Sequence, residues 1–311
     1  MKSIVITEFM DSDAVNLLSN NFNVFYDKDL INQKDKLFEL VSSCDAVIVR
    51  NKTQVKGELI ESAKKLKVIG RLGVGLDNID VVECKKRNIV VIPATGANNI
   101  SVAEYVMAGL LMLARGCYTN SSEVAAGKWP RERMVGGELF GKTLGLLGFG
   151  GIARDVARRA KAFGLNIVAH DPFINEESPV WKEHGVTSLT LKKMLGEADA
   201  LSLHVPLTDA TRNLISAERI ATMKQGAFLI NTARGGIVDE SALAEALRSG
   251  RLGGAMLDVF AKEPLPEGNP FASAPNCILT PHIAGITRES NKRVSFMIAE
   301  KVLAALKGET A

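Results

Sequence analysis

The fold is decided by residues 143–153, which read TLGLLGFGGIA. Residues 143–147 suit a buried strand, closely spaced glycines follow, and residues 154–163 then keep helical periodicity. Strand, glycine turn and helix in this order open a dinucleotide-binding unit, in which the helix N-terminus faces a pyrophosphate. The alternative is an ordinary strand-to-helix turn without a ligand. We expect cofactor contacts from the whole turn, namely Gly148, Phe149, Gly150, Gly151, Ile152 and Ala153.

An acidic residue favours the ligand-binding interpretation of this turn. Asp171 follows the next expected strand, at the distance where a carboxylate accepts hydrogen bonds from both ribose hydroxyls. Its charge would repel the 2′-phosphate of NADP, and no arginine follows it directly in Asp171-Pro172-Phe173. The sequence therefore predicts NAD as the cofactor.

Short β-branched runs alternate with helix-period segments along almost the whole chain, which is typical of parallel sheets covered on both faces. We expect strands at residues 4–6, 24–26, 46–49, 68–69 and 90–92, and later at 143–147, 166–169, 200–205, 227–230, 254–259 and 277–279. The six later strands match the count of a full Rossmann sheet.

The length of 311 residues fits two domains. We predict an α/β protein of two doubly wound domains, a smaller one formed by residues 1–99 and 282–311 and a Rossmann domain formed by residues 100–281. Ser101 and Glu104 fit a capping box at the start of a long apolar helix that ends near Arg115. Residues 288–306 suit an amphipathic helix that returns to the first domain.

Composition excludes several classes of protein. The 38 basic and 35 acidic residues leave a net charge of +3, too small to indicate binding to nucleic acid or to an anionic membrane. The longest apolar run, residues 105–114, is shorter than the roughly 20 residues that span a bilayer. The N-terminus lacks the order of a signal peptide, so we expect a cytoplasmic protein. Four cysteines without metal-ligand spacing predict reduced thiols and no metal site.

Four further motifs carry a specific resemblance. They are Gly70-Arg71-Leu72-Gly73-Val74-Gly75-Leu76-Asp77-Asn78-Ile79-Asp80, Asn231-Thr232-Ala233-Arg234-Gly235-Gly236, Asp258-Val259-Phe260-Ala261-Lys262-Glu263-Pro264 and Pro281-His282. Together with the glycine turn, their order and spacing resemble those of D-isomer-specific 2-hydroxyacid dehydrogenases. The resemblance covers essentially the whole chain and implies a flavodoxin-like substrate domain beside the Rossmann domain.

The resemblance implies a catalytic set of Arg234, Glu263 and His282. Oxidation of a 2-hydroxy acid sends a hydride to the nicotinamide and a proton to a base. Arg234 would bind the substrate with its planar guanidinium, and His282 would exchange the proton because imidazole titrates near neutrality. Glu263 would fix the ring and favour its protonated form. Taken singly, each could instead be an ordinary surface or loop residue.

The same resemblance places other residues around the ligands. His204, Thr232 and Asp258 would lie near the cofactor, with the Asp258 carboxylate facing the nicotinamide carboxamide. The turn with Val74 and Gly75 would present backbone amides to the substrate carboxylate.

Basic residues from separate segments predict a second anionic group on the substrate. Arg50 ends an expected strand, Arg71 precedes the glycine turn of the first domain, and Arg131 follows the long helix. These segments resemble D-3-phosphoglycerate dehydrogenases, so 3-phosphoglycerate is the expected substrate and 3-phosphohydroxypyruvate the product. (S)-sulfolactate, oxidised to sulfopyruvate, is the alternative, since (S)-sulfolactate dehydrogenases have similar motifs. Glycerate or lactate would need no second anion site.

Two departures from the family pattern bear on these expectations. Gly151 stands where the glycine turn commonly carries a basic residue, and Ala153 replaces the third glycine. A different class also stays open, because some relatives are NAD-sensing corepressors that keep the catalytic residues. Those proteins carry extra tails for peptide partners, whereas we assign almost all of this chain to two domains, so we expect an enzyme. We also expect a homodimer, which is usual in the family.

Overall fold

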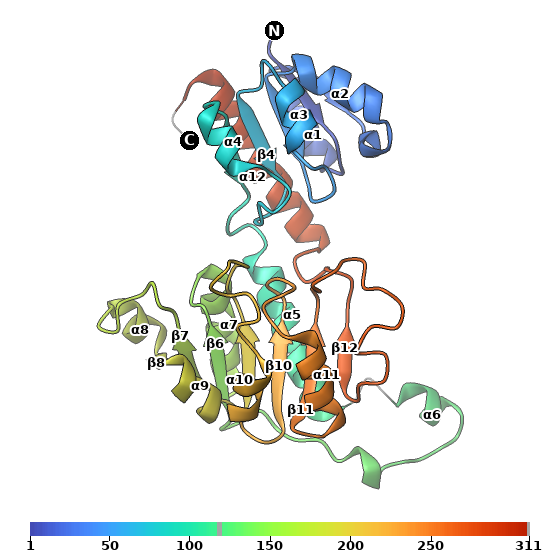
Figure 1. The fold of residues 1–311 in the computed structure, drawn as a ribbon, viewed down its shortest axis with the longest axis vertical. Helices are drawn as coiled ribbons and strands as arrows, with labels where there is room; N and C mark the ends of the chain where they lie inside the picture. Colours follow the sequence, from blue (N-terminus) through green and yellow to red (C-terminus); the bar gives the residue numbers. More distant parts are fainter. Residues whose placement is uncertain (117–119, 310–311) are drawn as a thin grey trace. The chain divides into compact units, whose positions relative to one another are not determined.

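The computed structural model describes residues 1–116 and 120–309, which form two compact units (Figure 1). Unit 1 consists of residues 1–98 and 286–311, and unit 2 of residues 99–285. The expected domain boundary after residue 281 therefore differs from the observed division by four residues. The reason is that the backbone amides of Ile283 and Ala284 bond to Asp258 of unit 2.

Unit 1 contains a five-stranded parallel sheet in the order β2-β1-β3-β4-β5. Its strands are β1 (Ser3–Ile6), β2 (Asn23–Tyr26), β3 (Ala46–Val49), β4 (Val68–Arg71) and β5 (Val90–Pro93). Each expected strand of the first third is present, because short β-branched runs suit strands buried on both faces. The strand order is that of flavodoxin-like folds.

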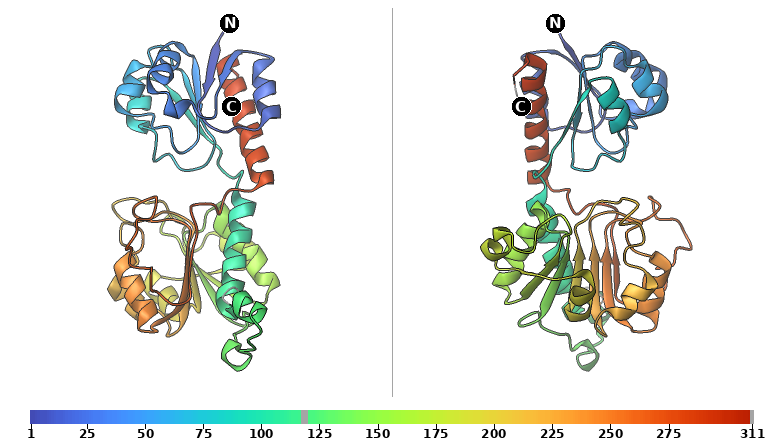
Figure 2. Two further views of the ribbon diagram at one scale, coloured as in Figure 1. Left: turned by 90° about the vertical axis from the view of Figure 1, so that its right-hand side faces the viewer. Right: turned by 60° about the vertical axis from the view of Figure 1, so that its left-hand side comes forward.

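Helices cover both faces of this sheet (Figure 2). They are α1 (Ser12–Ser19), α2 (Lys34–Ser43), α3 (Gly57–Ser62), α4 (Val81–Lys86) and α12 (Arg288–Lys307), with a 3₁₀ turn at Leu30–Asn32. Helices α1 and α12 share one apolar core with the sheet, while α2, α3 and α4 share the other. The segment expected to be an amphipathic tail helix is thus part of this unit's core.

Unit 2 contains a seven-stranded parallel sheet in the order β12-β11-β10-β9-β6-β7-β8. Its strands are β6 (Thr143–Leu147), β7 (Asn166–His170), β8 (Thr187–Ser188), β9 (Ala200–Leu203), β10 (Ala227–Asn231), β11 (Leu252–Leu257) and β12 (Cys277–Leu279). The six expected strands are present, and the order around β6 is that of a Rossmann sheet. Strand β8 was not expected, since two residues leave no periodic signal.

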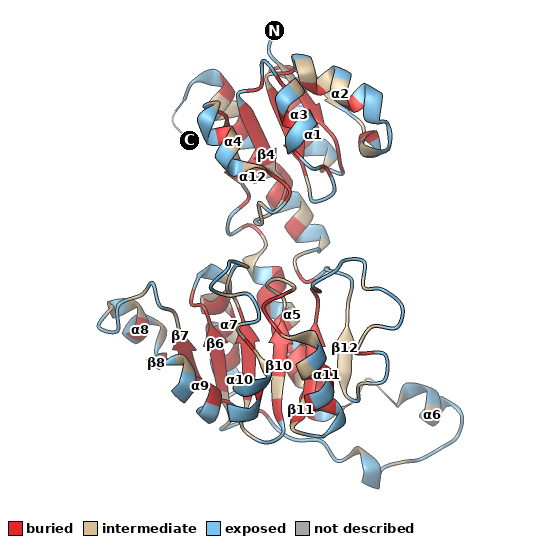
Figure 3. Ribbon diagram, in the orientation of Figure 1, coloured by how far each residue is buried: buried red, intermediate tan, exposed pale blue. Residues whose placement is uncertain are grey.

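The helices of unit 2 also lie on both faces of its sheet, whose strands are mostly buried (Figure 3). They are α5 (Asn99–Arg115), α6 (Ser121–Ala125), α7 (Gly151–Ala162), α8 (Pro179–His184), α9 (Leu191–Glu197), α10 (Ala217–Thr222) and α11 (Glu240–Arg248), with a 3₁₀ turn at Glu132–Met134. The longest apolar run lies in α5, as expected. No helix among the described residues is long and apolar enough to cross a membrane.

The predicted capping box at the start of α5 is wrong. The helix begins at Asn99, so Ser101 already lies in its first turn and is buried. Glu104 forms an ion pair with Arg159 of α7 at 3.5 Å. Ser101 is therefore a buried residue of the helix and not its N-cap. Among the cysteines, Cys44, Cys84 and Cys277 are free thiols, while Cys117 lies outside the described residues.

Candidate active site

The glycine turn joins β6 to the N-terminus of α7. Gly148 has a φ of +86°, and a Cβ there would stand 2.7 Å from the carbonyl oxygen of His204, so only glycine fits. At Gly150, the N-cap residue of α7, a Cβ would meet no other described atom within 4 Å. The backbone of Gly150 is therefore open to a ligand. Phe149 and Ala153 are fully buried, so their side chains belong to the core and do not face a ligand.

Asp171 lies beside this turn because β7 pairs with β6. Its Oδ2 accepts a hydrogen bond from the Phe149 amide at 2.8 Å, and its Oδ1 accepts one from the Phe173 amide at 3.0 Å. The carboxylate is thus fixed at the strand end while half-buried. Each oxygen has a further lone pair with which to accept a ribose hydroxyl.

His204 and Thr232 follow the neighbouring strands β9 and β10. Burial lowers the pKa of His204 to about 4, so its ring is neutral at pH 7, and Nε2 lies 3.0 Å from Ser202 Oγ. The Thr232 hydroxyl is buried and has no hydrogen-bond partner within the described part of the chain. Buried hydroxyls are nearly always paired, so this oxygen suits a polar atom of a bound cofactor.

Arg234 stands in the turn that follows β10. Asn231 holds the turn, since its side chain accepts from the Ala233 amide at 3.0 Å and donates to the Arg234 carbonyl at 2.8 Å. A Cβ on Gly235 would stand 1.8 Å from the carbonyl oxygen of Phe260. The turn with Arg234 therefore packs directly on the loop that follows β11.

Glu263 and His282 lie in the loops after β11 and β12, and their side chains meet. Nδ1 of His282 is 2.9 Å from Oε2 of Glu263, while the Phe260 amide donates to Oε1 at 3.1 Å. Since Nδ1 is engaged with the carboxylate, Nε2 is the ring atom available to a substrate. The structure thus brings together the predicted histidine and glutamate. Glu263 follows β11, which lies beside the strand of Arg234, and His282 follows β12, on the far side of β11.

Asp258 has a role that the sequence did not reveal. Its buried carboxylate accepts hydrogen bonds from Thr280 Oγ1 at 2.6 Å and from the amides of Ile283 and Ala284, each at 2.8 Å. Three bonds on both sides of His282 hold this residue in a left-handed conformation, with a φ of +57°. Asp258 therefore positions the histidine, and no motif spacing indicates such a contact.

Arg50 and Arg71 lie at neighbouring strand ends in unit 1. Arg50 follows Val49, which pairs with Arg71 in the β3–β4 ladder. Burial lowers the pKa of Arg50, and its Nη2 donates to Oδ1 of Asn291 on α12 at 2.5 Å. Parallel strands end at the same edge of a sheet, so both arginines lie at the carboxyl edge of this sheet.

Two buried side chains fix the loop that carries Arg50, and neither was singled out from the sequence. Glu8 accepts hydrogen bonds from the amides of Arg50, Lys52 and Thr53 at 2.9, 3.0 and 2.9 Å. Asn78 donates to the carbonyls of Arg50 and Thr53 at 3.1 and 2.7 Å. The loop is thus rigidly held before any ligand binds.

The turn with Val74 and Gly75 follows β4 directly. A Cβ on Gly73 would stand 1.6 Å from Nη1 of Arg71, which shows that the arginine folds over the turn. Val74 is exposed and Gly75 is half-buried, so their backbones are accessible.

Arg131 differs from the other predicted residues. It is exposed between α6 and the 3₁₀ turn at Glu132–Met134, and the structure does not bring it to any other predicted site residue of unit 2.

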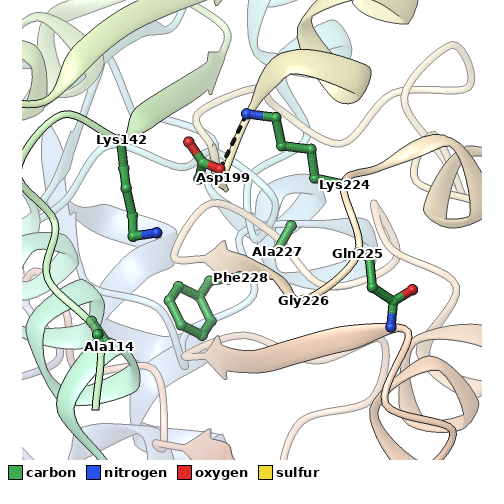
Figure 4. A pocket seen from close by; sticks show the side chains of 9 residues that line it. Ala114, Lys142, Asp199, Lys224, Gln225, Gly226, Ala227 and Phe228 are labelled. Atoms are coloured by element: carbon green, nitrogen blue, oxygen red, sulfur yellow. Dashed lines mark hydrogen bonds and ion pairs between the residues drawn. The ribbon is translucent and has the colours of Figure 1, made fainter.

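A cavity of about 160 Å³ lies at the opposite edge of the unit 2 sheet, where the strands begin (Figure 4). Lys142 precedes β6, Asp199 precedes β9 and Lys224 precedes β10, with Lys224 Nζ 3.1 Å from Asp199 Oδ1. No predicted site residue lines this cavity. In the described ranges no group of three or more histidine, cysteine or acidic residues could hold a metal ion.

Comparison with known proteins identifies the fold family. Residues 107–284 match the family described as "D-isomer specific 2-hydroxyacid dehydrogenase, NAD binding domain". The chain belongs to this family. It is therefore an NAD-dependent oxidoreductase, and unit 2 contains its NAD-binding domain. The glycine turn, Asp171 and the unpaired Thr232 hydroxyl fit this cofactor.

Relatives of known name match along the whole chain. An (S)-sulfolactate dehydrogenase from Chromohalobacter salexigens is 50% identical over 98% of this chain and 99% of its own length. A D-3-phosphoglycerate dehydrogenase from Methanocaldococcus jannaschii is 42% identical over 100% of this chain but only 59% of its own length. The crystal structure of the TT0316 protein from Thermus thermophilus has a TM-score of 0.89 at 36% identity, covering 99% of this chain and 97% of that one.

Proposed function

We propose that the protein oxidises a small 2-hydroxy acid with a second anionic group on C3, with (S)-sulfolactate as the first candidate and sulfopyruvate as the product. The observation that carries the reaction type is the hydrogen bond between His282 and Glu263 in the NAD-binding unit. Their roles, and that of Arg234, form part of the proposal.

In the proposed mechanism, His282 and Glu263 move a proton, and Arg234 binds negatively charged oxygens of the substrate. NAD, when bound, accepts the hydride that leaves C2 with its electron pair. His282 takes the hydroxyl proton at Nε2 as the C2–O bond becomes a carbonyl, and Glu263 stabilises the resulting imidazolium. Arg234 binds the developing carbonyl oxygen and the carboxylate. The reverse reaction uses the same groups.

Two arginines support a second anion on the substrate. Arg50 and Arg71 end neighbouring strands, and guanidinium groups bind sulfonate and phosphate through paired N–H donors. We rank (S)-sulfolactate ahead of 3-phosphoglycerate, the substrate expected from sequence, because the sulfolactate dehydrogenase relative is 50% identical to this chain and the phosphoglycerate dehydrogenase relative is 42% identical.

A substrate panel tests the proposal. We would measure kcat/KM with NAD for (S)-sulfolactate, 3-phosphoglycerate, glycerate and lactate. The proposal expects the doubly anionic acids to be favoured by at least about tenfold, since one charge-assisted hydrogen bond contributes about 1.5–3 kcal/mol. Preference for glycerate or lactate would contradict the second anion site. Tight NADH binding without turnover of any acid would favour the corepressor-like class instead.

A further inference from the structure

The glycine turn of unit 2 lacks the basic side chain that this position commonly carries, and a different residue occupies the space. A Cβ on Gly151 would stand 2.5 Å from Nδ2 of Asn99, 3.5 Å from its Cγ and 3.8 Å from its Oδ1. The side-chain amide of Asn99 thus lies where a side chain of residue 151 would begin, with its NH₂ group nearest the turn.

Close packing of two helices puts Asn99 there. Asn99 is the first residue of α5, and Gly151 is the first residue of α7. The small buried residues Ala103 on α5 and Ala153 on α7 belong to one core, so the helix axes can approach closely. The N-termini of both helices therefore lie side by side at the edge of the sheet where the nucleotide binds.

We propose that Asn99 is a cofactor-binding residue whose Nδ2 donates a hydrogen bond to the pyrophosphate of NAD, in place of the missing basic side chain at position 151. Two observations support a ligand here. The space above Gly150 is open, and α7 is a twelve-residue helix whose N-terminal amides favour an anion. The end of Asn99 that faces the turn is a donor, which is what a phosphate oxygen requires.

Arg154, the nearest basic residue of α7, is engaged elsewhere. Its Nε donates to the carbonyl of Phe149 at 3.1 Å, and its guanidinium carbon lies 5.7 Å from the centre of the Phe149 ring. The turn therefore has a neutral donor at the position where relatives commonly place a charge. This position therefore contributes no charge that attracts the pyrophosphate, and Asn99 can only orient it through a hydrogen bond.

Binding measurements without turnover test this proposal. We would titrate the protein with NADH and with ADP-ribose, following fluorescence and heat, and record Tm for each variant. Asn99→Ala should weaken both ligands by the same factor, roughly ten- to a hundredfold, because a hydrogen bond to a charged group is lost. Asn16→Ala, the same change at an exposed position of α1 in unit 1, is the control and should leave both affinities unchanged.

Asn99→Asp separates cofactor binding from a structural role. Aspartate at a helix N-terminus stabilises the helix, so Tm should stay the same or rise. The same charge repels the pyrophosphate, so NADH should bind more weakly than it does to Asn99→Ala. Equal or tighter NADH binding by Asn99→Asp would overturn the proposal.

A double-mutant cycle links the two positions. Gly151→Ala should displace the Asn99 amide and weaken NADH about as much as Asn99→Ala does. The double variant should lose no more than either single variant, because both changes remove one contact. Additive losses, an Asn99→Ala affinity within twofold of wild type, or a loss for NADH but not for ADP-ribose would each show that Asn99 does not hold the pyrophosphate.

Discussion

The proton step depends on one pair of residues, His282 and Glu263. We expect His282→Ala to lower kcat by about 10²- to 10⁴-fold, the contribution of a positioned acid-base group. NADH affinity should be unchanged, since the ring bonds to Glu263 and not to the nucleotide turn. Steady-state rates and NADH titration check this, and wild-type turnover by the folded variant would remove His282 from the mechanism.

Glu263→Gln should have a milder effect than His282→Ala. The amide oxygen can still accept a hydrogen bond from Nδ1 of His282, but the charge that stabilises the imidazolium formed in the reaction is lost. We expect kcat to fall by less than in His282→Ala, with NADH affinity unchanged. A wild-type kcat in this variant would contradict a role for the charge of Glu263.

Asp171 should determine the choice of cofactor. Its carboxylate is fixed by the amides of Phe149 and Phe173, so it cannot easily turn away from a 2′-phosphate. We expect wild type to favour NAD over NADP by kcat/KM, and Asp171→Ala to narrow this preference by removing both the repulsion and the ribose contacts. An unchanged ratio of the two cofactors in the variant would contradict the assignment.

Arg50 offers a test of the second anion site that leaves the fold intact. Asn291→Asp places a carboxylate where Asn291 accepts from Arg50, in the first turns of α12, where an acidic residue suits the helix. The new charge should compete for the guanidinium. We expect kcat/KM for sulfolactate or 3-phosphoglycerate to fall about ten- to a hundredfold while glycerate is little affected. Equal losses for all substrates would contradict the site.

At the level of the elements, loops after adjacent strands carry the catalytic candidates, and glycines let those loops touch. Gly235→Ala would push a Cβ into the carbonyl of Phe260, at 1.8 Å, so the backbone of both loops must shift. We expect lower kcat and lower Tm. Gly196→Ala in α9 is the matched control, because its nearest contact is 4.0 Å away and alanine favours a helix.

The same elements show how far sequence reasoning reaches. β-branched runs and the glycine turn predicted both sheets, because buried strands and nucleotide turns require particular residue types in a local order. Strand β8 and the start of α5 were missed or wrong, since pairing and helix packing decide them. The contacts of Asp258 with the loop of His282, of Glu8 with the Arg50 loop and of Asn99 with Gly151 join distant segments, and one sequence carries no local signal for them.

At the scale of the whole molecule, we expect a homodimer, and we propose one segment of unit 2 as its interface. Trp129 and Val135 are 79% and 84% exposed within residues 120–140. Large apolar side chains exposed on one segment are typical of protein interfaces. Light scattering after gel filtration at micromolar concentration should give a dimer for wild type and a larger monomer fraction for Trp129→Ser combined with Val135→Ser.

The control for this experiment is Val82→Ser in unit 1, where the side chain is 68% exposed but lies outside the segment. It removes a comparable apolar side chain and should leave the dimer intact, because exposure alone does not make an interface. A wild-type monomer would contradict the homodimer. If Trp129→Ser with Val135→Ser leaves the dimer unchanged, as Val82→Ser should, the interface lies on a different surface. Replacing Trp129 and Val135 with serine weakens the dimer only if these side chains are buried between the subunits.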